Sequence, residues 1–252
     1  RVSAWQTQRL PNRRRRNGCG PVMIIALLSL VIVAIVAAVI FIALLPQIGA
    51  RIVGLQPAGQ TERLFIETRA PAVPDIANVL PQARTVANQV QVNAGASSFA
   101  LDTSAVPVQT GLSASGVESA VVSLTEAEVN TLCRQRTTLC TTGDGQIRNA
   151  TIDLRAGGAV VYAEFRIPET GLWQRVGVVV KINEQRNGLT VAGVDIDGTL
   201  YAIPNDGIAT ALYTVSAEAN RLIQESVVAI GGQNYRIREL FADTSRLTVI
   251  LR

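Results

Sequence analysis

The stretch VMIIALLSLVIVAIVAAVIFIALL, residues 22–45, holds 24 consecutive uncharged residues between Pro21 and Pro46. A helix of that length covers about 36 Å, which is enough to cross a hydrocarbon core of about 30 Å. The buried helix of a globular domain and the apolar part of a signal peptide are both shorter. The stretch therefore predicts a single transmembrane helix.

The flank that precedes this helix is strongly basic. Residues 1–21 carry six arginines, four of them consecutive at positions 13–16, and no Asp or Glu. On the other side of the helix the nearest basic residues are Arg51 and Arg63. The positive-inside rule therefore predicts a cytoplasmic N-terminus and an extracytoplasmic location for the rest of the chain. The expected location is the cell membrane, with one pass.

The basic residues outside this flank do not favour nucleic acid as a partner. Six of the 23 basic residues lie in residues 1–21, which leaves 17 against 19 acidic residues. A slightly acidic outer part gives nucleic-acid binding no electrostatic support. The arginines of the flank serve as a topology signal, and they are also placed to contact anionic headgroups.

The composition also limits the chemistry that the chain can perform. It contains no His, which excludes His-based triads, His general bases and His metal ligands. In an oxidising compartment Cys133 and Cys140 are a candidate disulfide, although their spacing leaves the pairing open. Two thiols without a further Cys or His nearby do not favour a zinc site. We therefore expect no catalytic residue, metal or cofactor.

The segment that follows the transmembrane helix has few structural signals. Residues 46–115 contain six prolines and no strong helical or strand period. This composition is typical of an extended connector. The sequence therefore predicts four parts: a basic tail at 1–21, the membrane helix at 22–45, a stalk at 46–117 and an extracytoplasmic domain at 118–252.

The predicted outer domain begins with a well-marked helix. In the segment LTEAEVN, residues 124–130, Thr125 and Glu128 have the spacing of a capping box. Leu124 and Val129 have the positions of a hydrophobic staple. We expect a short strand at 119–124 and a helix from this motif to about Thr137.

Residues 146–203 change to a period of two, which indicates antiparallel strands. Val176, Val178 and Val180 recur at every second position, with Arg175 and Lys181 on the other face, so they share one face of a long strand. Asn187-Gly188 is a strong hairpin signal. The segment predicts a strand meander with one apolar face.

A second, longer helix is predicted after Asn205. Its apolar residues recur in steps of three and four as far as Ile230, and Gly231-Gly232 resembles a helix C-cap. The predicted fold class is α+β, with an antiparallel sheet curled against this long helix. A candidate apolar groove for a ligand would then be formed by Val176, Val178, Val180, Ile208, Leu212, Val215 and Leu222. A closed core is the default interpretation of such an apolar stripe, and the groove is the alternative.

The order of these elements is similar to that of a known family. The membrane helix ending in Leu-Pro, the LTEAEVN helix start, the meander and the segment GTLYAIP, residues 198–204, resemble the YpmS-like family of anchored envelope proteins. More distantly, they are similar to lipid-binding domains of the TULIP type. The resemblance covers about 118–252 and the membrane helix. It implies a helix wrapped by a curled sheet, with a groove for acyl chains and no catalytic residue.

One motif has an enzymatic alternative. VDIDGTL, residues 194–200, matches the aspartyl nucleophile signature of haloacid-dehalogenase-like phosphatases. That chemistry also needs a lysine and later acidic residues on a parallel core, whereas the only lysine, Lys181, precedes the motif. We expect Asp197-Gly198 to form a turn between two antiparallel strands.

Two functions remain open from the sequence. The first is a non-catalytic, membrane-anchored envelope protein whose outer domain binds lipid or another apolar ligand. The alternative is a structural or accessory subunit of a larger membrane complex. The expected partners are the lipid bilayer and, in the second case, other membrane subunits.

Overall fold

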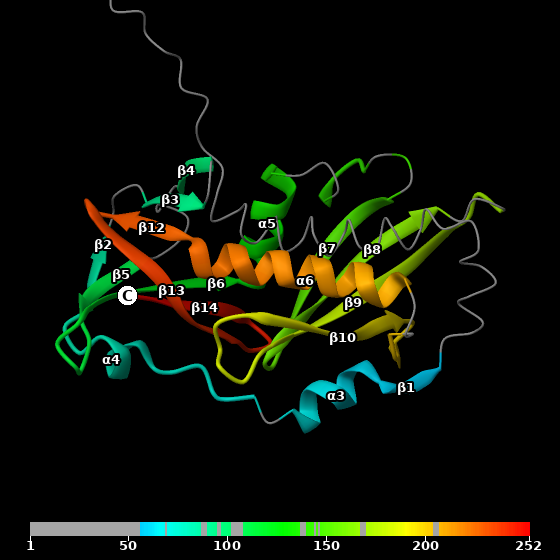
Figure 1. Cartoon of the computed structure of the whole chain (residues 1–252), viewed down its shortest axis with the longest axis horizontal. Helices are drawn as coiled ribbons and strands as arrows, with labels where there is room; N and C mark the ends of the chain where they lie inside the picture. The colour runs from blue at the N-terminus through cyan, green and yellow to red at the C-terminus, as the bar shows by residue number, and fades with distance from the viewer. Residues whose placement is uncertain are drawn as a thin grey trace, which may run out of the picture.

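The computed structural model describes residues 56–68, 70–86, 90–94, 97–101, 108–136, 140–143, 145, 147–166, 170–203 and 207–252. Strands dominate this part and form two antiparallel sheets (Figure 1). The predicted basic tail and transmembrane helix, residues 1–45, lie outside it. Within the described ranges, no helix combines the length and the apolar character that a membrane crossing requires.

The first sheet has six strands in the order β1-β11-β10-β9-β8-β7. Most of it is a meander in which neighbours along the chain pair directly and in antiparallel fashion. Its strands are β1 (Pro57–Gln60), β7 (Ile147–Arg155), β8 (Gly158–Arg166), β9 (Trp173–Ile182), β10 (Leu189–Ile196) and β11 (Thr199–Tyr201).

The second sheet has eight strands in the order β2-β5-β6-β14-β13-β12-β3-β4. It combines strands from the middle of the chain with strands from its C-terminal end. Its strands are β2 (Arg84–Val86), β3 (Val90–Ala94), β4 (Ser97–Leu101), β5 (Val108–Leu112), β6 (Glu118–Thr125), β12 (Val227–Ile230), β13 (Gln233–Ala242) and β14 (Arg246–Leu251).

Helices lie around these sheets. They are α3 (Thr61–Glu67), α4 (Ile76–Val79), α5 (Glu126–Arg136) and α6 (Gly207–Glu225). The predicted capping box of α5 is confirmed: Glu128 N donates to Thr125 Oγ1 at 3.3 Å, and Thr125 N donates to Glu128 Oε2 at 2.6 Å. Helix α6 runs along the molecule and contacts β10 of one sheet and β13 of the other (Figure 1).

The main core lies between the two sheets. Val178 and Val180 of the first sheet belong to the same buried apolar cluster as Val228 and Leu251 of the second. Backbone hydrogen bonds also join the sheets, since Gly157 N donates to the carbonyl oxygen of Ala242 at 2.9 Å. Packing and hydrogen bonding together hold the sheets as one body.

The predicted fold class is wrong. Instead of one sheet curled against a long helix at the end of an extended stalk, the protein is mostly β and has two sheets. The segment expected to be a stalk supplies β1 to the six-stranded sheet and β2 to β5 to the eight-stranded one. These strands are short, and β1 pairs with β11, which is distant in sequence. Local periodicity therefore carries no signal for them.

The second predicted helix also ends earlier than expected. Helix α6 ends at Glu225, and Val227–Ile230 forms β12, which pairs with β3 and β13. Gly231 and Gly232, with φ angles of 60° and 88°, make the tight turn into β13 instead of a helix cap. A Gly-Gly pair suits either structure, and the β-branched residues before it favour the hairpin.

Candidate functional site

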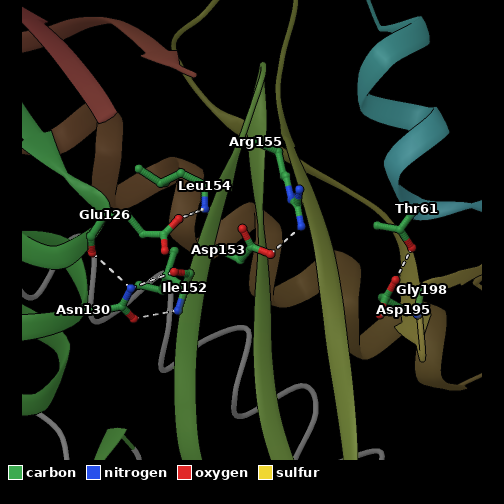
Figure 2. Close-up of polar contacts among 9 residues, drawn as sticks. All are labelled: Thr61, Glu126, Asn130, Ile152, Asp153, Leu154, Arg155, Asp195 and Gly198. Atoms are coloured by element: carbon green, nitrogen blue, oxygen red, sulfur yellow. Dashed lines mark hydrogen bonds and ion pairs between the residues drawn. The ribbon is translucent and has the colours of Figure 1, made fainter. Parts of the chain in front are cut away.

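The LTEAEVN motif holds the edge of the six-stranded sheet. Asn130 Oδ1 accepts a hydrogen bond from Ile152 N at 2.8 Å, and Asn130 Nδ2 donates to the Ile152 carbonyl oxygen at 2.7 Å. Glu126 Oε2 accepts from Leu154 N at 2.9 Å. Figure 2 shows both side chains reaching from α5 to β7. Side chains of a helix therefore take the place of a neighbouring strand.

This arrangement gives the polar residues of the motif a structural role. An uncovered edge strand offers unpaired N–H and C=O groups to other chains. Because Glu126 and Asn130 occupy three of these groups on β7, that part of the edge is closed to pairing. Cys133 and Cys140 are both buried and joined in a disulfide with Cα atoms 5.7 Å apart, which fastens the end of α5.

The VDIDGTL motif forms a turn between antiparallel strands, as expected. Ile196 pairs with Thr199, and Asp197 and Gly198 have φ angles of 53° and 82°. Asp195 is 0% exposed and accepts hydrogen bonds from Thr61 Oγ1 and from Gly198 N. Figure 2 shows Thr61 and Asp195 facing each other. A buried carboxylate held in this way fastens the start of α3 to the sheet.

Tyr162 lies beside this buried carboxylate. Burial of the phenol, together with the negative charge of Asp195, raises the pKa of Tyr162 to about 12. The ring covers Gly177, where an added Cβ would come within 2.7 Å of the ring atom Cε1. Glycine at this position therefore lets the ring lie flat on the sheet.

The predicted groove residues are found in two different situations. Val178 and Val180 are 0% and 4% exposed within the core between the sheets, and Val176 packs against the same core. The side chains of Ile208, Leu212, Val215 and Leu222 lie outside the described part of the chain. A groove between the two sets stays a prediction, and the three valines already pack against other side chains.

A cavity of about 320 Å³ opens where the two sheets meet. Lys181 of β9 lines it together with Asn183 and Arg186 of the β9–β10 connection, and Leu240 to Ala242 line it from β13. Arg186 pairs with Glu239 at 3.5 Å, and its guanidinium lies 5.0 Å from the centre of the Phe241 ring. The cavity is mixed in polarity, and it does not include the predicted groove residues.

The outer face of the six-stranded sheet carries a set of arginines and aromatic rings. We call it the arginine–aromatic surface, and it comprises Arg148, Tyr162, Glu164, Arg166, Trp173 and Arg175. The Arg148 guanidinium lies 3.9 Å from the centre of the Trp173 ring, and that of Arg175 lies 4.1 Å from the centre of Tyr162. These are cation–π distances.

Strand register brings these residues together. Glu164 lies opposite Arg148 on one side and Arg175 on the other, and Arg166 lies opposite Trp173. Arg148 Nε donates to Glu164 Oε2 at 2.7 Å, and this hydrogen bond lowers the pKa of Glu164. Alternation in β8 and β9 predicted polar outer faces, but the sequence alone did not identify which residues become neighbours across the strands.

No family model, curated protein or solved structure matches this chain. The resemblance to the YpmS-like family therefore stays a prediction. Among the residues that the structure describes, no group of three or more His, Cys, Asp or Glu side chains is arranged to hold a metal ion.

Proposed function

We propose that this chain is a single-pass, membrane-anchored envelope protein whose extracytoplasmic domain is a non-catalytic structural or accessory module of a membrane complex. The uncharged stretch at 22–45 and the arginines at 13–16 support the anchor and its direction. The domain after the anchor then acts on the outer side of the membrane.

One observation supports the accessory role: the domain fills its interior with its own side chains. The apolar faces of both sheets pack against each other, with Val178 and Val180 in the common core. The conspicuous polar residues Asn130 and Asp195 are bonded within the domain. Recognition of other molecules is thereby left to the exterior of the domain.

Internal binding of an acyl chain is the competing function. It requires the apolar stripe of α6 to stand away from the sheets and leave space for a ligand. Ile223 of α6, which belongs to that stripe, is 2% exposed and packs with Leu240 of β13. This contact supports a helix that is closed on the sheets, so we rank the accessory role first.

Purification of the full chain in mild detergent, followed by mass spectrometry of proteins and lipids together, tests the proposal. We expect stoichiometric partner chains and no retained acyl lipid beyond what a control membrane protein carries. A preparation without partners that contains one bound lipid per chain would favour internal ligand binding instead. An N-terminal tag that protease removes from the outside of intact cells would overturn the proposed topology.

A further inference from the structure

One end of the six-stranded sheet combines positive charge with exposed apolar groups. Leu172 is 65% exposed and directly precedes Trp173, the first residue of β9. Arg166, the last residue of β8, lies opposite Trp173 and is exposed. Leu172 therefore lies at the same end of the sheet as Trp173 and Arg166.

The charges of this surface do not balance. Three arginines, Arg148, Arg166 and Arg175, accompany one carboxylate, that of Glu164. Arg148 takes this carboxylate in a 2.7 Å ion pair, while the guanidinium of Arg175 stacks on Tyr162. Among the described residues, Arg166 has no carboxylate partner. The surface as described is therefore cationic and suited to an anionic partner.

The position of β1, where the chain enters the domain, indicates which anionic partner lies near this surface. Figure 1 places β1 at the same end of the molecule as the neighbouring ends of β8 and β9. Ten residues, 46–55, separate the proposed membrane helix from Gln56. Ten residues span at most about 35 Å when fully extended. The start of β1 therefore lies within about 35 Å of the end of the proposed membrane helix, which leaves this end of the domain within reach of the bilayer.

We propose that the arginine–aromatic surface, together with Leu172, docks on anionic phospholipid headgroups of the membrane that anchors the chain. Guanidinium groups bind phosphate oxygens in a two-pronged manner. Tryptophan and leucine enter the boundary between headgroups and acyl chains, where an amphipathic ring is favoured. The inference rests on the proposed anchor, and it adds a second, reversible contact with the bilayer.

Fluorescence of Trp173 tests this docking directly. The chain has two tryptophans, Trp5 and Trp173, so a Trp5→Phe full-length protein reports on Trp173 alone. We reconstitute it into vesicles of phosphatidylcholine with or without phosphatidylglycerol, and a brominated lipid acts as quencher. Quenching is expected in the anionic vesicles, and it is expected to fall at about 0.5 M salt, where the screening length is about 4 Å.

Two double variants with the same loss of charge separate docking from general electrostatics. Arg166→Gln with Arg175→Gln removes two arginines of the surface, and we expect a docking constant about 25-fold lower, or about fivefold for each residue. Arg236→Gln with Arg238→Gln removes two exposed arginines of β13 and is expected to leave quenching unchanged. Urea unfolding of both proteins checks that they remain folded.

An alkaline carbonate wash of the same vesicles tests the anchor separately. Release of the protein by the wash would overturn the proposed membrane anchor. A protein that resists the wash but shows no quenching of Trp173 would overturn the docking alone. Equal quenching in neutral and anionic vesicles, or protection of Trp173 by a copurified acidic protein instead of lipid, would overturn recognition of anionic headgroups.

Discussion

The side-chain amide of Asn130 pairs with both backbone groups of Ile152, at 2.8 Å and 2.7 Å, much as a neighbouring strand would. One residue of a helix therefore satisfies two backbone groups of an edge strand. Because Asn130 also donates to the carbonyl oxygen of Glu126 in its own helix, its side chain is held in a single orientation. Figure 2 shows this position between α5 and β7.

Replacing Asn130 tests how much this pairing contributes. Asn130→Leu leaves two backbone groups of β7 without partners, and we expect the free energy of unfolding to fall by about 2–3 kcal/mol. Asn130→Asp keeps the acceptor for Ile152 N but places a carboxylate oxygen against the carbonyl oxygens of Ile152 and Glu126, so we expect it to lower the stability as well. Urea unfolding measures both variants, with Thr131→Ala on the exposed side of α5 as the control. Equal stability of Asn130→Leu and the control would contradict the assigned role.

The disulfide between Cys133 and Cys140 predicts the number of reactive thiols and a loss of stability when the bond is removed. Of the three cysteines, only Cys19 should react with a thiol reagent in the oxidised, unfolded protein. Because the bond closes a short loop, it lowers the conformational entropy of the unfolded chain and raises the free energy of unfolding by about 2.5 kcal/mol. We expect the Cys133→Ala, Cys140→Ala protein to lose about this much in urea unfolding. Three reactive thiols in the untreated protein would rule out the bond.

The hydrogen bond from Thr61 to the buried Asp195 is expected to hold α3 and β1 on the sheet. Thr61→Val removes the donor while keeping the shape, and a hydrogen bond to a charged group contributes about 1.5–3 kcal/mol. We therefore expect faster hydrogen exchange across residues 57–67, measured by mass spectrometry. Thr61→Ser keeps the hydroxyl and should exchange like the unchanged protein. Unaltered exchange in the valine variant would show that other contacts hold this segment.

The raised pKa of Tyr162 predicts a loss of stability at alkaline pH. The phenol ionises at about pH 12 in the folded state and at about pH 10 in the unfolded chain. Between these values the unfolded state releases its proton first, so stability falls as the pH rises through this window. The side chain is half-buried, and screening by water keeps the effect modest.

Comparison with a Tyr162→Phe protein isolates this contribution, because Tyr235, whose pKa is also raised, is present in both. Urea unfolding at about pH 9 and about pH 11 should show a smaller alkaline loss in the Phe protein. Equal losses in the two proteins would mean that Tyr162 ionises normally.

Features that depend on neighbours in sequence were predicted well. The capping box of Thr125 and Glu128 and the turn at Asp197-Gly198 are both present. A capping box spans four residues, and a hairpin turn needs a positive φ that glycine adopts without strain. The prediction at Gly231-Gly232 was wrong because a helix cap and a hairpin turn both require a positive φ angle.

The sequence by itself determined an uncharged stretch long enough to cross a bilayer, the asymmetry of the arginines around it, the absence of histidine chemistry and the strand meander of residues 146–203. Each of these depends on composition or on spacing within a short window. Only the tertiary structure decided that the strands β1 to β5 belong to two sheets and that Arg148, Glu164 and Arg175 lie side by side. Pairing between strands depends on register and on partners far along the chain, so no short window of sequence contains it.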